Sequence, residues 1–278
     1  MRIGGSIEKN YKNPQEWYAL VQELGYRAVL TPVSFEASAQ EKADYLACIK
    51  EHDLVLGEVG AWCNPLSLDK EIRSKALTHC KNQLQLAEEL GANCCVNIAG
   101  STGEIWDGFC AQNYQKDTYA LIVDTVREII DAVKPEKTFY TLEPMPWMVP
   151  SSPEEYLQLI KDVDRTAFGV HLDFTNMINC PERFVYRDAF IEKCFTMLAP
   201  YIKSVHGKDV NMSGKLPCII EETMPGKGCV DYQKVVRLCN KLGKDMPLFV
   251  EHLPDHESYM KAAAYVRKQA EIAGVELP

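Results

Sequence analysis

Short apolar runs rich in β-branched residues alternate with longer amphipathic runs along the whole chain, and we count eight such pairs. The runs expected as strands are RIGGS (2–6), AVLTP (28–32), VLGEVG (55–60), CCVNIAG (94–100), TFYTLEP (138–144), FGVHLDF (168–174), IKSVHGKD (202–209) and LFVEHL (248–253). Strands that alternate with helices along a chain form a parallel sheet covered by helices. Eight such units are what an α/β fold of the (β/α)8 TIM-barrel type requires.

Two segments carry clear helix signals. The apolar residues of 77–92 fall largely on one side of a helix, and Gly91 supplies its C-terminal stop. Pro153, which follows Ser151 and Ser152, marks the start of another helix. The longest irregular stretch, 210–228, is punctuated by Gly and Pro and is expected as a loop.

A doubly wound open sheet is the alternative fold. No G-x-G-x-x-G motif opens a helix after the first expected strand, where the chain reads GGSIEKN, so nucleotide binding has no support. The chain contains no linker and no internal repeat, and residues 1–278 are therefore expected to form a single barrel domain. The chemistry of such a barrel takes place at the C-terminal ends of its strands.

Composition narrows the range of functions. A net charge of −9 without a basic tract argues against nucleic-acid binding. No run approaches the roughly 18 apolar residues of a membrane span, and the first residues lack a secretory h-region, so a cytoplasmic protein is expected. The eleven cysteines include no C-x-x-C pair, which favours reduced, mostly buried thiols over disulfides or a zinc site.

Four successive strands of the expected barrel end in side chains that can bind a metal. They are Glu143, Asp173, His206 and Glu251, about one strand-helix unit apart. Taken singly, such a residue more often caps a helix or pairs with Arg, but neighbouring strand ends lie roughly 4.8 Å apart and four of them can converge on one ion. Three carboxylates and one imidazole favour one divalent cation, with Mn²⁺ ahead of Mg²⁺, Co²⁺ or Zn²⁺.

The motifs TLEP, HLDFTNM, SVHGKD, PGKGCVDY and FVEH resemble, in order and spacing, the sugar isomerase/epimerase superfamily of xylose-isomerase-like TIM barrels. The likeness runs over nearly the whole chain. It implies that Glu143, Asp173, His206 and Glu251 hold one divalent cation, and that Glu143 and Glu251 also serve as the catalytic acid/base pair. His252 is expected to point the other way along an alternating strand, as a structural residue. A homo-oligomer is expected from the same resemblance.

The chemistry implied is proton transfer next to a carbonyl. A cation that chelates the carbonyl and a neighbouring hydroxyl of a keto-sugar or polyol ketone acidifies the C–H between them and stabilises the enediolate. One glutamate removes the proton. Return of a proton to the same carbon gives an epimer, and return to the neighbouring carbon gives aldose–ketose isomerisation.

Two residues are expected on the same inward strand face as a predicted metal ligand. Lys208 follows His206 by two positions and is a candidate for binding a substrate oxygen; the alternative is an ion pair with Asp173 or Asp209. His171 precedes Asp173 by two positions and is either a substrate contact or a packed core residue.

Four further residues are candidates for contacting the sugar: Glu58, Trp62, Asn97 and Trp147. Sugars stack on aromatic rings and need fixed hydrogen bonds, although ordinary burial under a loop is the alternative for both tryptophans. The PGKG stretch at 225–228 is interpreted as a turn that sets the next helix, ahead of a phosphate cradle.

The resemblance covers the metal ligands but not the residues that surround the substrate in the family. In the ketose 3-epimerase branch a His, an Arg and a Glu occupy the positions that Asn176, Met212 and Val149 hold here. A lyase or dehydratase of the same superfamily therefore remains an alternative: an inosose dehydratase, or the catalytic subunit of a C-glycoside deglycosidase that works with a small partner subunit. Six histidines and the acidic charge speak against an endonuclease IV-like repair enzyme, and intact ligands speak against a non-catalytic barrel.

Overall fold

The computed structural model describes residues 1–278, and its centre is an eight-stranded parallel sheet curled into a nearly closed barrel. The strands are β1 (Arg2–Gly5), β2 (Ala28–Leu30), β3 (Val55–Gly60), β4 (Cys94–Asn97), β5 (Phe139–Leu142), β6 (Phe168–Asp173), β7 (Ile202–Gly207) and β10 (Pro247–Val250). Their order in the sheet is β1-β10-β7-β6-β5-β4-β3-β2. The predicted single-domain (β/α)8 fold is confirmed, and the doubly wound alternative is wrong.

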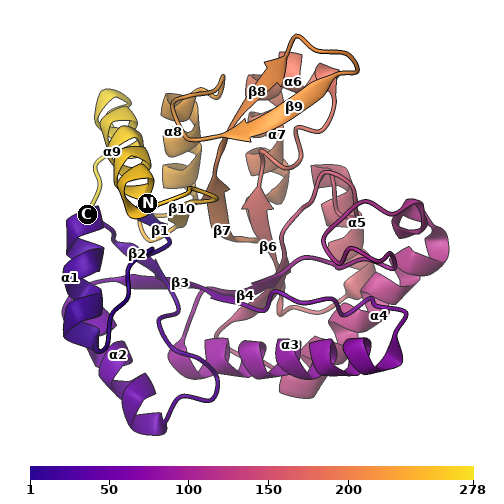
Figure 1. Cartoon of the computed structure of the whole chain (residues 1–278), viewed down its shortest axis with the longest axis horizontal. Coiled ribbons are helices and arrows are strands. Elements are labelled where there is room, and N and C mark those ends of the chain that lie inside the picture. The colour runs from indigo at the N-terminus through magenta and orange to yellow at the C-terminus, as the bar shows by residue number, and fades with distance from the viewer.

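Helices cover the outside of this barrel (Figure 1). They are α1 (Pro14–Leu24), α2 (Ala39–Glu51), α3 (Lys70–Leu90), α4 (Lys116–Val133), α5 (Pro153–Val163), α6 (Pro181–Val185), α7 (Arg187–Leu198), α8 (Tyr232–Leu242) and α9 (His256–Ile272), with a 3-10 turn η1 (Ala111–Tyr114) before α4. None of them combines the length and the apolar composition that a membrane span requires.

The two clearest helix predictions are confirmed, with one difference in length. Ser152 caps α5 by accepting a hydrogen bond from the backbone of Glu155, and Pro153 is its first residue. α3 ends before Gly91 as expected but begins at Lys70, because the Asp69 carboxylate caps two backbone N–H groups there.

The seam of the barrel lies between β1 and β2. These strands do not form a ladder, but the backbone N–H of Arg27 donates to the carbonyl of Ile3 at 2.9 Å, and the carbonyl of Arg27 accepts from Val55 at 3.0 Å. The residue that precedes β2 thus connects β1 to β3 across the seam.

Most strands end earlier than the apolar pattern predicts. The expected runs 138–144 and 248–253 shorten to β5 and β10, so Glu143 and Glu251 lie just beyond the last residue of each ladder. The Glu143 backbone still donates to the carbonyl of Asn97 at 2.7 Å, and both glutamates line the mouth of the barrel.

One predicted loop is a hairpin. Within 210–228, β8 (Asp209–Ser213) pairs antiparallel with β9 (Ile219–Thr223) and stands out from the end of β7 in orange (Figure 1). The prediction of a loop was wrong for 210–213 and 219–223, because exposed residues on both strands blur the alternation expected of a half-buried strand.

Candidate metal centre

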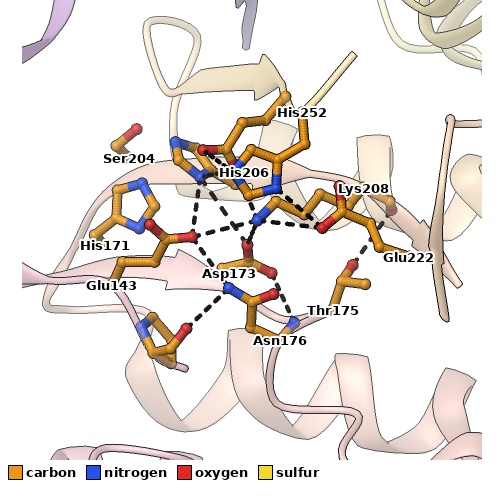
Figure 2. A network of polar contacts seen from close by, with 12 residues as sticks. Glu143, His171, Asp173, Thr175, Asn176, Ser204, His206, Lys208, Glu222 and His252 are labelled. Atoms are coloured by element: carbon orange, nitrogen blue, oxygen red, sulfur yellow. Dashed lines mark hydrogen bonds and ion pairs between the residues drawn. The ribbon is translucent and has the colours of Figure 1, made fainter. Parts of the chain in front are cut away.

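Four ligand-type side chains gather at the C-terminal ends of β5, β6, β7 and β10, which are consecutive in the sheet. Asp173 and His206 are register partners on β6 and β7, while Glu143 and Glu251 follow β5 and β10. One ligand atom from each of the four lies within 4.8 Å of every other. All are buried or nearly so, and Figure 2 shows Glu143, Asp173 and His206 turned toward one another.

The donor atoms of this cluster fit a divalent cation. Asp173 Oδ2, His206 Nδ1 and Glu251 Oε2 are buried and make no aligned hydrogen bond, and their close partners are one another and the Lys208 ammonium. Buried polar atoms that converge on one point and meet only other charged groups there are placed as the ligands of an ion would be. A set of three carboxylates and one imidazole suits Mn²⁺, Mg²⁺ or a similar ion.

Lys208 reaches into the same cluster from the end of β7. Its buried ammonium lies 2.7 Å from Asp173 Oδ2, 2.7 Å from Glu251 Oε2 and 3.4 Å from Glu143 Oε1 (Figure 2). Of the two ion pairs considered for it, the one with Asp173 forms. Burial lowers the pKa of Lys208, but the surrounding carboxylates, Asp173 foremost, raise it well above its ordinary value, and the side chain is a cation at neutral pH.

Charges around the cluster keep its glutamates ionised. Burial raises the pKa of Glu143, and so does Glu251, but Lys208 and His206 bring it down to about 2. The pKa of Glu251 likewise falls well below its ordinary value, against burial, because His206 and Lys208 lie beside it. Burial raises the pKa of Asp173 to about 6 despite Lys208. All three are mainly carboxylates at pH 7.

Glu58 joins the cluster from the opposite side of the barrel. This buried β3 carboxylate lies 3.3 Å from His206 Nε2 and 3.1 Å from His171 Nε2, and it accepts a hydrogen bond from the Ser204 hydroxyl. His206 therefore turns Nε2 toward Glu58 and Nδ1 toward Glu143, Asp173 and Glu251. A carboxylate on the far nitrogen fixes the orientation in which a histidine ligates a metal.

Asn176 holds two of the carboxylates in place. Its side-chain amide donates to Glu143 Oε1 at 3.1 Å, and its backbone N–H donates to Asp173 Oδ1 at 2.8 Å (Figure 2). The position where the ketose 3-epimerase branch has His thus carries an amide that orients the cluster.

A cavity of about 500 Å³ opens beside the cluster. Glu143 and Glu251 line it, whereas Asp173 does not. Its walls offer the hydroxyls of Ser6 and Thr31 and the rings of Trp62 and Trp106. Hydroxyls, carboxylates and aromatic faces are what a sugar requires of a binding site.

The other predicted substrate contacts lie in different places. Asn97 is buried, exchanges hydrogen bonds with the backbone of Cys63, and does not line the cavity. His171 is fully buried, and its ring packs edge-on against His206 with centroids 4.0 Å apart. Trp147 does not line this cavity either; its indole N–H donates to the carbonyl of Asp107 at 2.7 Å. Asn97 thus holds the backbone at Cys63, and His171 packs behind His206; neither borders the cavity.

His252 does not point away from the site as strand alternation predicts. Its backbone has a φ of 53°, which breaks the alternation immediately after Glu251. The imidazole lies 3.3 Å from Glu251 Oε1 and 3.0 Å from Glu222 Oε2, and it borders the cavity.

The PGKG turn is closed around a carboxylate of the protein itself. Asp209 is buried and accepts backbone hydrogen bonds from Gly226 and Gly228 at 3.0 Å, from Val210 at 2.8 Å and from Val230 at 2.9 Å. A Cβ on Gly228 would lie 2.2 Å from Asp209 Oδ1, so only glycine fits there. The interpretation as a structural turn holds, because the anion-binding N–H groups are already occupied.

Sequence reasoning did not identify Ser6, Thr31, Trp106, Ser204 or Glu222 as part of this region. Glu222 lies on β9, and its carboxylate comes within 3.8 Å of the Lys208 ammonium. No motif marks these residues. Ser6, Thr31 and Trp106 lie on loops, and Glu222 lies on a hairpin that the apolar pattern did not reveal. Ser204 lies within β7 and joins the region only through its contact with Glu58 across the barrel.

Comparisons with known proteins agree with this architecture. The structure of D-psicose 3-epimerase from Clostridium cellulolyticum H10 with D-tagatose superposes with a TM-score of 0.70 at 14% identity, covering 99% of this chain and 100% of that one. The 3-keto-D-glucoside 4-epimerase of E. coli gives a TM-score of 0.70 at 14% identity, covering 96% and 99%. A Mycobacterium smegmatis xylose isomerase-like TIM barrel protein in complex with magnesium gives 0.66 at 17%, covering 94% and 90%.

At these identities the likeness shows the fold. A search of curated proteins by sequence found no match. The model of the xylose isomerase-like TIM barrel family, by contrast, matches residues 18–269, nearly the whole barrel. The chain is therefore a member of the xylose isomerase-like TIM barrel family.

Proposed function

We propose that this protein is a divalent-metal-dependent isomerase or epimerase of a keto-sugar or polyol ketone. The observation that carries the proposal is the placement of two ionised glutamates, Glu143 and Glu251, on the wall of one cavity and within the same four-residue cluster. Structural neighbours that act as sugar epimerases support it. We place this activity in the cytoplasm, in keeping with eleven cysteines that are all free.

Glu143, Asp173, His206 and Glu251 would hold the cation, with Mn²⁺ favoured by the donor set. When bound, a divalent cation supplies Lewis acidity that polarises a carbonyl and makes the neighbouring C–H more acidic. Asp173 does not reach the cavity, so its contribution is ligation alone. Assembly into a homo-oligomer and binding of a small partner subunit stay predictions.

Glu143 and Glu251 exchange protons with the substrate. One, as a carboxylate, accepts the proton from the carbon next to the carbonyl; the same glutamate then returns it, or the other does after it has taken a proton from solvent. Lys208 lies between them and, being fully buried and absent from the cavity wall, acts by keeping both carboxylates ionised. The hydroxyls of Ser6 and Thr31 and the faces of Trp62 and Trp106 orient the sugar.

The test is metal-dependent hydrogen exchange. The purified protein, with Mn²⁺ or with EDTA, is incubated in D₂O with a panel of keto-sugars, inososes and oxidised glycosides, and deuterium uptake and products are followed by NMR. We expect deuterium to enter next to the carbonyl, and Glu143→Gln and Glu251→Gln each to slow this exchange by about 10²–10⁴-fold.

Glu192→Gln is the matched control, because Glu192 is an exposed residue that pairs with Lys234 far from the cluster. It should exchange at the wild-type rate. Elimination products in place of epimers or isomers would identify the lyase alternative. Absence of exchange with every compound, despite a bound metal, would contradict the two-glutamate mechanism.

A further inference from the structure

A second cavity, of about 520 Å³, adjoins the first. It is walled by the loops after β5 and β6 and by the hairpin of β8 and β9 (Figure 1). The two cavities share Met145 and His252, and Asn176, which lines the second, contacts Glu143, which lines the first. A ligand that extends from the first cavity past Met145 and His252 would therefore occupy both.

The polar groups of the second cavity are already engaged within the protein. The Asn176 side-chain amide donates to Glu143 and to the carbonyl of Pro144, and the Asn179 amide donates to the carbonyl of Pro146 at 2.9 Å. Glu222 pairs with His252 (Figure 2). Few polar groups remain for a ligand, so an occupant gains mainly from apolar contact.

Apolar surface dominates what is left. Pro146, Trp147, Ile178, Val210 and Ile220 contribute to the lining. The Trp147 ring is held by its hydrogen bond to Asp107, which itself borders the first cavity. A fixed indole beside proline and isoleucine is a surface for a flat or apolar group.

The hairpin is built to face this cavity. Cys218, Ile220 and Glu222 are alternate residues and all line it, so one face of β9 is turned inward, whereas Ile219 belongs to the other face. Hairpin and loops thus form the wall of the second cavity, and Met145 and His252 mark its border with the first.

We infer that the substrate has two parts: a keto-sugar that binds in the first, hydroxyl- and carboxylate-lined cavity, and an apolar or aromatic aglycone that binds in the second. This inference rests on the proposed function and names its substrate class as glycosides. A free monosaccharide would leave the second cavity, about 520 Å³, empty.

A glycoside imposes a condition on the preceding reaction. Its anomeric carbon is bound to the aglycone, so the ring does not open to a free carbonyl. The carbonyl must therefore come from oxidation of a ring hydroxyl, a two-electron step carried out by a dehydrogenase with its own acceptor. The step here needs no oxidant, because one proton leaves the carbon next to that carbonyl and one proton returns.

The test compares methyl 3-keto-β-D-glucoside with 4-nitrophenyl 3-keto-β-D-glucoside on the Mn²⁺-loaded protein. Calorimetry gives the Kd of each, and exchange in D₂O gives kcat/KM. We expect the nitrophenyl compound to bind at least about tenfold more tightly. Ile220→Trp, which fills the second cavity, should remove this preference and leave the methyl compound within about twofold, whereas Ile219→Trp on the opposite face should keep it.

The two measurements separate the inference from the proposed function. Equal Kd and kcat/KM for both compounds, unchanged by Ile220→Trp, would overturn the two-part substrate and leave the isomerase function intact. Selective binding of the nitrophenyl compound without exchange would support the second cavity and overturn the function. Retained binding of the methyl compound shows that the Ile220→Trp variant is folded.

Discussion

Glu58 is the residue whose contacts bear most directly on how a cation is held. It bridges His171 and His206 inside the barrel and sets which nitrogen of His206 faces the carboxylates. We expect Glu58→Gln to weaken Mn²⁺ binding about 10–100-fold, because the imidazole loses the carboxylate that orients it. Titration calorimetry measures this directly.

A matched variant keeps that prediction specific. Glu192→Gln removes an exposed carboxylate of the same chemistry and should bind Mn²⁺ like the wild type. Circular dichroism verifies that the Glu58→Gln variant is folded. Wild-type affinity in a folded Glu58→Gln protein would show that the orientation of His206 does not depend on Glu58.

His206 predicts how cation binding depends on pH. Burial lowers its pKa, but Glu251, Glu58 and Glu143 raise it well above its ordinary value, so the metal-free protein carries an imidazolium. A ligand must be neutral, and Mn²⁺ therefore displaces a proton. The affinity should rise about tenfold per pH unit from pH 6 to 8, with a steeper slope below the Asp173 pKa of about 6.

The sign follows from linkage. A raised histidine pKa stabilises the metal-free fold below the unfolded pKa of roughly 6.5, and this contribution disappears as the pH rises through the folded value. Higher pH thus removes the His206 proton, which competes with the cation for the imidazole. Calorimetry in two buffers of different ionisation enthalpy counts the protons released; a count near zero with a flat affinity would contradict a charged His206.

The loop between β7 and α8 depends on one side chain. Asp209 accepts four backbone hydrogen bonds that tie the start of β8 to the PGKG turn. We expect Asp209→Ala to lower the free energy of unfolding by about 3 kcal/mol or more, because buried N–H groups lose their acceptor. Urea unfolding followed by circular dichroism measures the change.

Two comparisons support the interpretation of that experiment. Asp209→Asn keeps one carbonyl acceptor and should cost less than the Ala variant. Asp188→Ala, at an acidic residue in the first turn of α7 that makes no such cradle, should stay within about 0.5 kcal/mol of the wild type. If Asp209→Ala lowers the free energy of unfolding by less than about 1 kcal/mol, water must accept the hydrogen bonds of the turn's N–H groups in place of Asp209.

The course of the chain around the barrel was predictable from the sequence, because each strand is a short apolar run followed by an amphipathic helix. The same order places Glu143, Asp173, His206 and Glu251 at neighbouring strand ends without any knowledge of side-chain geometry. Contacts across the barrel were not predictable. Glu58 meets His206 through the interior, and nothing local in the sequence specifies which side chains of opposite strands meet.

Departures from regular backbone also escaped prediction. His252 turns into the site through its positive φ, which strand alternation does not anticipate. The hairpin that supplies Ile220 and Glu222 is stabilised by pairing between two partly exposed strands, and an exposed strand has little apolar pattern. Both features border the cavities beside the cluster, where regular sequence rules are expected to weaken if the site is functional.

The four predicted ligands join one half of the barrel. They lie at the ends of β5, β6, β7 and β10, none of them comes from β2 or β3, and in the metal-free protein the three carboxylates face the Lys208 ammonium and the His206 imidazolium. Mn²⁺ at one hundred times its Kd should therefore raise the free energy of unfolding by about 2.7 kcal/mol. Hydrogen exchange read by mass spectrometry should show slower exchange in β5–β7 and β10.

The position of this protection distinguishes a cation at the cluster from general stabilisation. Binding at the four strand ends slows local opening only where the bound strands must separate, so exchange at β2, next to the weakly bonded seam with β1, should change little. Glu251→Gln should lose the protection together with the gain in stability. Uniform slowing over the whole barrel, or protection that persists in Glu251→Gln, would place the cation elsewhere.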